Sequence, residues 1–311
     1  MREILETLRG WGAEGLRAAS ATVVKTERSA PREPGSSLAV SERGDIVGSV
    51  TGGCVEPAVY EEARAVLAGE RPRLVTYGID DEQAFEVGLP CGGTVHVFVD
   101  LVDDAVVSDL AAAVAEERPV ALESVVAGDG VGEKRIVSAA GGSEPALEGN
   151  VFTLPFLPRP RMYVFGAVDH AAALARVGRL LGYRVTVSDA RERFVTSERI
   201  PDADELVVGW PDEVLRDAPV DERTAICVLT HDHKLDVPAL KAALASPAGY
   251  IGAMGSRRTT EAREALLREE GVSDEELARI KAPIGLDIGS RTPAEVAIAV
   301  AAEIVSLRRK G

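Results

Sequence analysis

Short runs of alternating apolar and polar residues, separated by turn residues, dominate the first third of the chain. The runs 21–26, 36–41 and 45–50 are rich in β-branched residues and are flanked by Pro, Gly, Ser and Asp, a pattern typical of antiparallel strands. A helix is predicted at 1–11 and another over 55–69, followed by strands over 73–78 and 91–102. These elements indicate a compact α+β module.

The pattern changes after a proline-rich stretch. A helix at 104–117 and further strand-like runs lead to LPFLPRPR at 154–161, whose prolines mark a boundary. From there strand and helix alternate, beginning with RMYVFG at 161–166, which predicts βα units on a parallel sheet. Thr292, Pro293 and Glu295 form the pattern of a capping box before the last helix. We therefore expect two domains, 1–158 and 159–311, the second a doubly wound, Rossmann-like α/β domain.

Composition and charge narrow the function. The net charge of −15 over 311 residues argues against nucleic acid as a partner, because binding the phosphate backbone needs clustered Lys and Arg. No apolar run approaches the length of a membrane span and the first residues do not read as a signal peptide, so we expect a soluble, cytoplasmic protein. The chain has three cysteines, which we expect to be free thiols. Cys227, inside an apolar strand, is expected to be buried.

The other two cysteines each adjoin a glycine pair. Cys54 follows Gly52 and Gly53 and precedes a predicted helix, where unpaired N–H groups and the helix dipole would favour its thiolate. Cys91 precedes another glycine pair. We expect both thiols to lie in loops that face a shared cleft and to be reactive or metal-ligating, with Cys54 as the candidate metal ligand. Structural packing of one or both is the alternative.

In the second half, the first βα turn carries part of a dinucleotide-binding pattern. Gly166 stands at its first glycine position, but Val168 replaces the second glycine, where the backbone would approach a pyrophosphate. Asp189 ends the next strand, where this fold places the acid that binds a ribose hydroxyl. A solvated aspartate at a strand end is the alternative interpretation.

Two further stretches follow strands that end at the carboxyl edge of the sheet, where open α/β folds bind ligands. The first could contact a ligand or metal, or could be an exposed, capped helix start; it contains His231, Asp232, His233 and Asp236. The second, a glycine turn at a helix start, could bind a phosphate-bearing anion or be a solvated turn; it contains Gly255, Ser256, Arg257 and Arg258.

Taken together, these segments resemble the XdhC/CoxI family of accessory proteins for molybdenum-cofactor enzymes. The resemblance spans nearly the whole chain, in order, and is carried by ATVVKTERSAPREPGSSLAV, GSVTGGCVEPAV, GLPCGGTVHVFV, LTHDHKLDVPAL, YIGAMGSRR and PIGLDIGSRTPAEVAIAVAAEI. It implies an N-terminal XdhC/CoxI domain and a C-terminal Rossmann-like domain. The turn GAVDHA departs from the GAGHVA of many members, which puts dinucleotide binding by this turn in doubt.

The resemblance also implies a function. Proteins of this family bind the molybdenum cofactor (molybdopterin), protect it while a cysteine desulfurase installs its sulfido ligand, and deliver it to an apo-hydroxylase of the xanthine dehydrogenase or carbon monoxide dehydrogenase type. Carried over, Cys54 is the preferred metal-side thiol and Cys91 the next. A soft thiolate suits a soft metal, and arginines at a helix start suit a phosphate or nucleotide tail.

Two other functions stay open. The chain could be an oxidoreductase that uses NAD(P) or another nucleotide on its second domain, or a scaffold that binds only partner proteins. A molybdenum-cofactor accessory protein is the preferred hypothesis, and a homodimer is one open assembly state.

Overall fold

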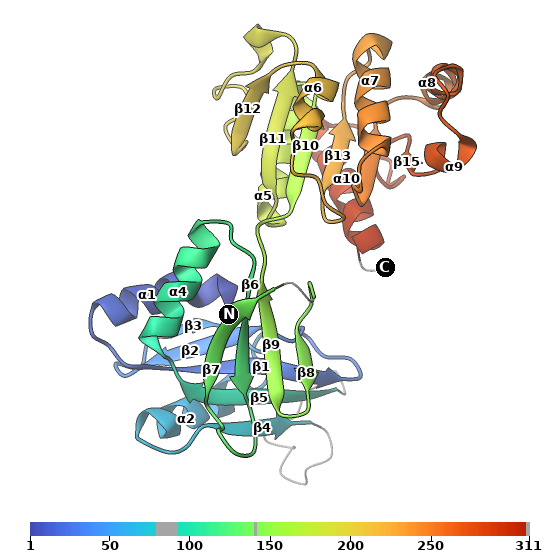
Figure 1. Cartoon of the computed structure of the whole chain (residues 1–311). Helices are drawn as coiled ribbons and strands as arrows, with labels where there is room; N and C mark the ends of the chain where they lie inside the picture. The colour runs from blue at the N-terminus through green and yellow to red at the C-terminus, as the bar shows by residue number, and fades with distance from the viewer. Residues whose placement is uncertain (79–92, 140–141, 309–311) are drawn as a thin grey trace. The chain divides into compact units, whose positions relative to one another are not determined.

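The structure, a computed structural model, describes residues 1–78, 93–139 and 142–308. The chain divides into two compact units, Met1–Pro158 and Arg159–Gly311, and the boundary lies in the proline-rich stretch 154–161. Both contain helices and strands; among the described residues, the parallel sheet belongs to the second unit (Figure 1).

The N-terminal unit is built on a five-stranded antiparallel sheet in the order β3-β2-β1-β5-β4. A second antiparallel sheet has the order β7-β6-β9-β8. In chain order the elements are α1 Leu5–Ala13, β1 Ala18–Glu27, β2 Ser37–Ser41, β3 Ile46–Gly48, α2 Glu56–Leu67, β4 Arg73–Tyr77, β5 Thr94–Leu101, α4 Asp104–Ala115, β6 Val120–Val125, β7 Lys134–Ser138, β8 Ala146–Glu148 and β9 Val151–Phe156.

The larger sheet is buried on both faces. Val95, Val97 and Val99 of β5 share a core with α2, as the alternation in the sequence predicts. Phe98 of the same strand points the other way, into a core shared with α1, α4 and the second sheet. The short strand β3 leads directly into the loop of residues 49–55. This loop ends at α2, the helix that packs on the Val95 face of the larger sheet.

The C-terminal unit is a six-stranded parallel sheet in the order β12-β11-β10-β13-β14-β15, which confirms the predicted Rossmann-like fold. In chain order its elements are β10 Arg161–Phe165, α5 Asp169–Leu180, β11 Arg184–Asp189, β12 Glu205–Val208, α6 Pro211–Arg216, β13 Ala225–Val228, α7 His233–Leu244, β14 Tyr250–Ala253, α8 Arg257–Glu269, α9 Asp274–Leu277, β15 Ile280–Lys281 and α10 Pro293–Arg308.

Helices cover both faces of this sheet. α5 and α10 share one core with the strands, and α6, α7 and α8 contribute to the core on the other face. The predicted capping box of α10 is confirmed: the Thr292 N–H donates to Glu295 at 2.9 Å and the Glu295 N–H donates to Thr292 at 3.3 Å. The strand order reverses between β10 and β13, where ligands bind in folds of this type.

Candidate functional site

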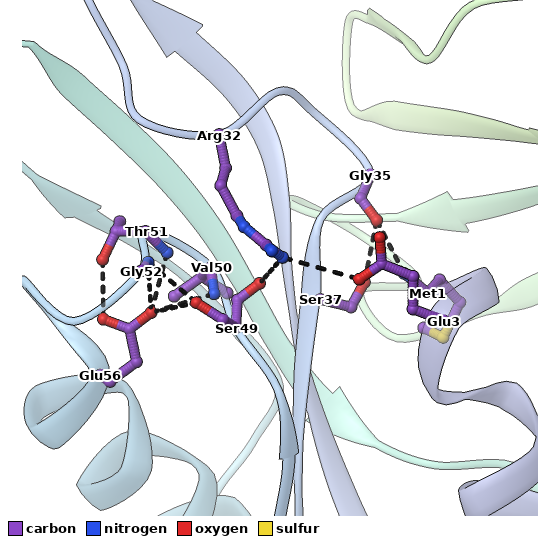
Figure 2. Close-up of polar contacts among 10 residues, drawn as sticks. All are labelled: Met1, Glu3, Arg32, Gly35, Ser37, Ser49, Val50, Thr51, Gly52 and Glu56. Carbon is purple, nitrogen blue, oxygen red and sulfur yellow. Dashed lines mark hydrogen bonds and ion pairs between the residues drawn. The ribbon is translucent and has the colours of Figure 1, made fainter. Parts of the chain in front are cut away.

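In the loop of residues 49–55, residues 49–53 surround a single carboxylate, and Figure 2 shows the first four of them around it. Glu56, the first residue of α2, accepts hydrogen bonds from four consecutive backbone N–H groups and two hydroxyl groups. Oε1 accepts from Ser49 Oγ at 2.6 Å and from the N–H groups of Val50 at 3.2 Å, Thr51 at 2.9 Å and Gly52 at 2.9 Å. Oε2 accepts from Thr51 Oγ1 at 2.7 Å and from the Gly53 N–H at 2.8 Å.

Glycine is needed in this loop for its backbone conformation. Gly52 and Gly53 have φ angles of +86° and +129°, in the left-handed region that L side chains rarely adopt. A Cβ atom placed on either would meet no atom within 4 Å, so both glycines face open space. The loop therefore has a fixed shape and an uncrowded outer surface next to Cys54.

Cys54 is half-buried, and its side chain packs at the edge of the core under α2. The sequence predicts that its thiol faces unpaired N–H groups at the helix start. The N–H groups of residues 50–53 are not among them, because they donate to Glu56, which also places a negative charge at the start of the helix. Burial raises the pKa of Glu56, but the hydrogen bonds from Ser49, Thr51 and Gly53 outweigh it and hold the pKa well below its usual range.

An arginine that the sequence analysis did not identify supports the same loop. Arg32 donates from Nη1 to the Ser49 carbonyl oxygen at 3.1 Å, and the same nitrogen lies 3.7 Å from the Glu3 carboxylate (Figure 2). Next to it, the Met1 amine donates to the Gly35 carbonyl at 2.8 Å. Arg32 stands between two prolines in PREPG, a pattern that predicts a turn but says nothing of what its side chain contacts.

The other two cysteines are Cys91 and Cys227. Cys91 lies outside the described residues, so the predicted cleft shared with Cys54 stays a prediction. Cys227 is fully buried in β13, as predicted, and burial raises the pKa of its thiol. Of the two described cysteines, Cys54 is therefore the one that solvent or a ligand can reach.

In the C-terminal unit, Gly166 allows two loops to meet at the switch point of the sheet. Its φ is +106°, and a Cβ atom there would lie 2.8 Å from Thr230 Cγ2 in the loop after β13. Val168 is the N-cap residue of α5 and packs against the core below the sheet edge. The turn is therefore closely packed where a dinucleotide pattern would have a second glycine.

Asp189 does not have the free carboxylate that ribose binding would require. It is buried, and Arg191 donates to both of its oxygens, from Nε at 2.9 Å and from Nη2 at 2.7 Å. The N–H groups of Ala167 and Arg191 add hydrogen bonds of 2.9 Å each. Burial raises the pKa of Asp189, but the bonds from Arg191 outweigh it and keep the pKa low. Arg191 also stacks on Phe194, 4.3 Å from the ring centroid.

The stretch from His231 to Asp236 does not form one cluster. His231, Asp232 and His233 are exposed, and Asp232 caps α7 by accepting from the Lys234 N–H at 3.0 Å. Asp236 points inward and is fully buried, so the prediction that it contacts a ligand with the other three is wrong. Within residues 1–78, 93–139 and 142–308, no group of three or more His, Cys, Asp or Glu side chains could hold a metal ion.

Asp236 instead pairs with Arg263 of α8, a residue that the sequence analysis did not identify. The Arg263 Nη2 atom lies 3.1 Å from Asp236 Oδ2, and the two side chains are 2% and 0% exposed. The same nitrogen donates to the Met254 carbonyl at 2.5 Å, and the Thr230 hydroxyl donates to Asp236. An arginine at the third position of EAREAL reads as a surface residue, so no sequence signal reveals this pair.

The turn before α8 keeps the features that the sequence predicts for it. Ser256 caps the helix by accepting from the Thr259 N–H at 3.2 Å, and Arg257 and Arg258 are exposed in its first turn. Gly255 has a φ of +155°, and a Cβ atom there would lie 3.3 Å from Arg263 Nη2. The first turn of α8 carries no acidic residue, unlike that of α2, so its positive end is not offset locally.

Comparison with known proteins now gives the family. The model of the XdhC and CoxI family matches residues 11–78, and the model of the XdhC Rossmann domain matches residues 162–304. A relative from Bacillus subtilis (strain 168), named as a probable subunit of xanthine dehydrogenase, is 27% identical over 316 residues, covering 94% of each chain. The molybdenum cofactor insertion chaperone PaoD from Escherichia coli (strain K12) is 29% identical over 297 residues, covering 94% of this chain and 84% of PaoD.

A solved structure agrees with this assignment at the level of the fold. A crystal structure described as a xanthine dehydrogenase from Bacillus halodurans superposes with a TM-score of 0.79 at 24% identity, covering 98% of this chain and 96% of that one. No helix among the described residues is long and apolar enough to cross a membrane. With one family model matching each unit, the chain belongs to the XdhC/CoxI family.

Proposed function

We propose that this protein binds the molybdenum cofactor and delivers it to a molybdenum hydroxylase. Family membership and the relative named as a molybdenum cofactor insertion chaperone support this function. The single structural observation that carries it is the loop of residues 49–55, which holds a half-buried thiol beside two glycines that face open space. A thiolate is a soft ligand and suits a soft metal centre better than hard oxygen ligands do.

In this proposal Cys54 contacts the metal end of the cofactor, and Gly52 and Gly53 leave room for the pterin. Separately, we propose that the turn of Gly255, Ser256, Arg257 and Arg258 in the C-terminal unit binds a phosphate-bearing anion, because it offers a helix start, a hydroxyl and two exposed guanidinium groups. The apo-hydroxylase and a cysteine desulfurase are the proposed partners, the latter as the source of the sulfido ligand.

The structure offers less support for an enzyme that uses NAD(P). The acid expected to bind ribose, Asp189, is buried and paired with Arg191, and Val168 replaces a glycine in the adjoining turn. We therefore do not advance a dehydrogenase as a second function.

The test is retention of cofactor by the purified protein. The protein is incubated with released molybdenum cofactor and passed over a gel-filtration column; molybdenum is measured by mass spectrometry and the pterin by fluorescence after oxidation. We expect co-elution of both with the wild type and loss of most of the molybdenum from Cys54→Ser. Cys227→Ala is the matched control, because it removes a thiol that is 0% exposed.

Two results would contradict the proposal. Absence of co-elution with the wild type would argue against cofactor binding altogether. Equal retention by Cys54→Ser and Cys227→Ala would remove the thiol from the site. Delivery is measured separately, as the activity that the loaded protein restores to an apo-hydroxylase.

A further inference from the structure

The backbone of residues 50–53 has the shape of an anion-binding site. Successive N–H groups that converge on one point form a concave surface that binds phosphate and similar anions in many proteins. Here the four N–H groups converge on the Glu56 carboxylate at 2.8 to 3.2 Å. The chain therefore fills its own anion site with a side chain from the next helix.

Among the described residues, no ion pair joins Glu56 to a basic side chain. Arg32, the basic residue beside the loop in Figure 2, donates to the Ser49 carbonyl oxygen and lies near Glu3 instead. The loop thus carries a half-buried thiol and a carboxylate charge, and the N–H donors of residues 50–53 are already used.

We propose that Glu56 is a specificity-determining residue, which excludes phosphate and other anions from the loop and leaves Cys54 to an uncharged or metal-centred electrophile. The proposal rests on the proposed function and adds one point to it: a phosphate group of the molybdenum cofactor does not bind at this loop. Glu56 also acts as a positioning residue, because its hydrogen bonds hold the glycine turn that carries Cys54.

The experiment compares two alkylating reagents that differ by one charge. Iodoacetamide is neutral and iodoacetate is anionic; both react when the thiolate attacks the methylene carbon, forming a C–S bond and releasing iodide. The rate at Cys54 is measured at one fixed pH by mass spectrometry of its peptide in the full-length protein. The ratio of the two rates does not depend on the thiolate fraction, since both reagents use the same nucleophile.

In Glu56→Gln we expect the ratio of iodoacetate to iodoacetamide rates to rise about threefold, the size of the effect of one unit charge acting through bulk water over about 6 Å. The rise should shrink in 1 M salt, where the screening length falls to about 3 Å. Glu61→Gln is the matched control: it removes an exposed carboxylate further along the same helix, and the ratio should stay at the wild-type value.

Glu56→Asp separates charge from loop structure. It keeps the charge but shortens the side chain, so it should loosen the loop and raise both rates while leaving the ratio unchanged. An unchanged ratio in Glu56→Gln would overturn the proposal, whether or not both rates rise together. Because these measurements use no cofactor, such a failure would leave the Cys54 retention experiment to decide the proposed function.

Discussion

The buried pair of Asp236 and Arg263 makes a strong prediction about stability. Asp236→Asn removes one charge and keeps the shape of the side chain. Arg263 is 2% exposed, and its Nε and Nη1 atoms have no hydrogen-bond partner among the described residues, so Asp236 is the carboxylate that compensates its buried charge. Removing one partner of a buried pair typically costs about 3–5 kcal/mol, because the remaining charge stays buried and uncompensated.

The cost is measured by urea unfolding of the full-length protein. Its two tryptophans, Trp11 and Trp210, lie in different units, so Trp11→Phe leaves a fluorescent reporter in the C-terminal unit alone. With a urea dependence of about 2 kcal/mol per M, the predicted loss lowers the unfolding midpoint of Asp236→Asn by about 2 M. Arg258→Gln, an exposed change on the same helix as Arg263, should shift the free energy of unfolding by less than about 0.5 kcal/mol.

A double variant tests the reason for the loss. Asp236→Asn combined with Arg263→Met removes both charges, so it should recover most of the stability that Asp236→Asn loses alone. The reasoning is refuted if Asp236→Asn unfolds at the same urea concentration as Arg258→Gln. It is equally refuted if the double variant is less stable than the single one, because the penalty would then come from lost packing and not from an unpaired charge.

Three further outcomes follow from other contacts. The pKa of Glu56 is lowered in the folded protein, so the stability contributed by its carboxylate is present above the ordinary Glu pKa of about 4.3 and is lost as the pH falls toward the native value. The stability difference between the wild type and Glu56→Gln, measured by urea unfolding, should therefore shrink between about pH 5 and pH 3; a constant difference would contradict this. Gly48→Ala should destabilise the N-terminal unit by about 2–4 kcal/mol, because Gly48 has a φ of +80° and its Cβ would lie 2.2 Å from the Ser37 carbonyl oxygen. The loss is measured by unfolding followed through Trp11 fluorescence in a Trp210→Phe chain; a loss under about 0.5 kcal/mol would show that the end of β3 simply shifts. Cys227 should react with iodoacetamide at least about 100-fold more slowly than Cys54, because it is buried and its pKa is raised; comparable rates would mean that β13 opens readily.

The order of elements could be predicted from the sequence because each rests on a local signal. Alternating valines in β5 and the strand–helix rhythm after residue 161 follow from periodicity, and the α10 cap follows from residue types at fixed spacing. Both sheets of the N-terminal unit need pairings between distant strands, which no local pattern specifies.

The candidate site could be predicted only in part, for the same reason. Cys54 and its glycines stand out because the motif is contiguous. The state of Asp189 depends on the direction taken by Arg191, and that of Asp236 depends on Arg263, which belongs to the next helix along the chain. Residue type and position at a strand end predict that an acid is near a sheet edge, but not whether another side chain has already neutralised it.

The carboxylate that shapes the Cys54 loop belongs to a helix, and this limits how the loop can move. Val59, Ala63 and Val66 fix α2 against the sheet, so a shift of one residue along the helix axis, about 1.5 Å, would disrupt that packing. Under the proposed function, a ligand of Cys54 therefore meets a loop whose shape is already set, and selection among ligands should depend on their fit to that shape and not on closure of the loop around them.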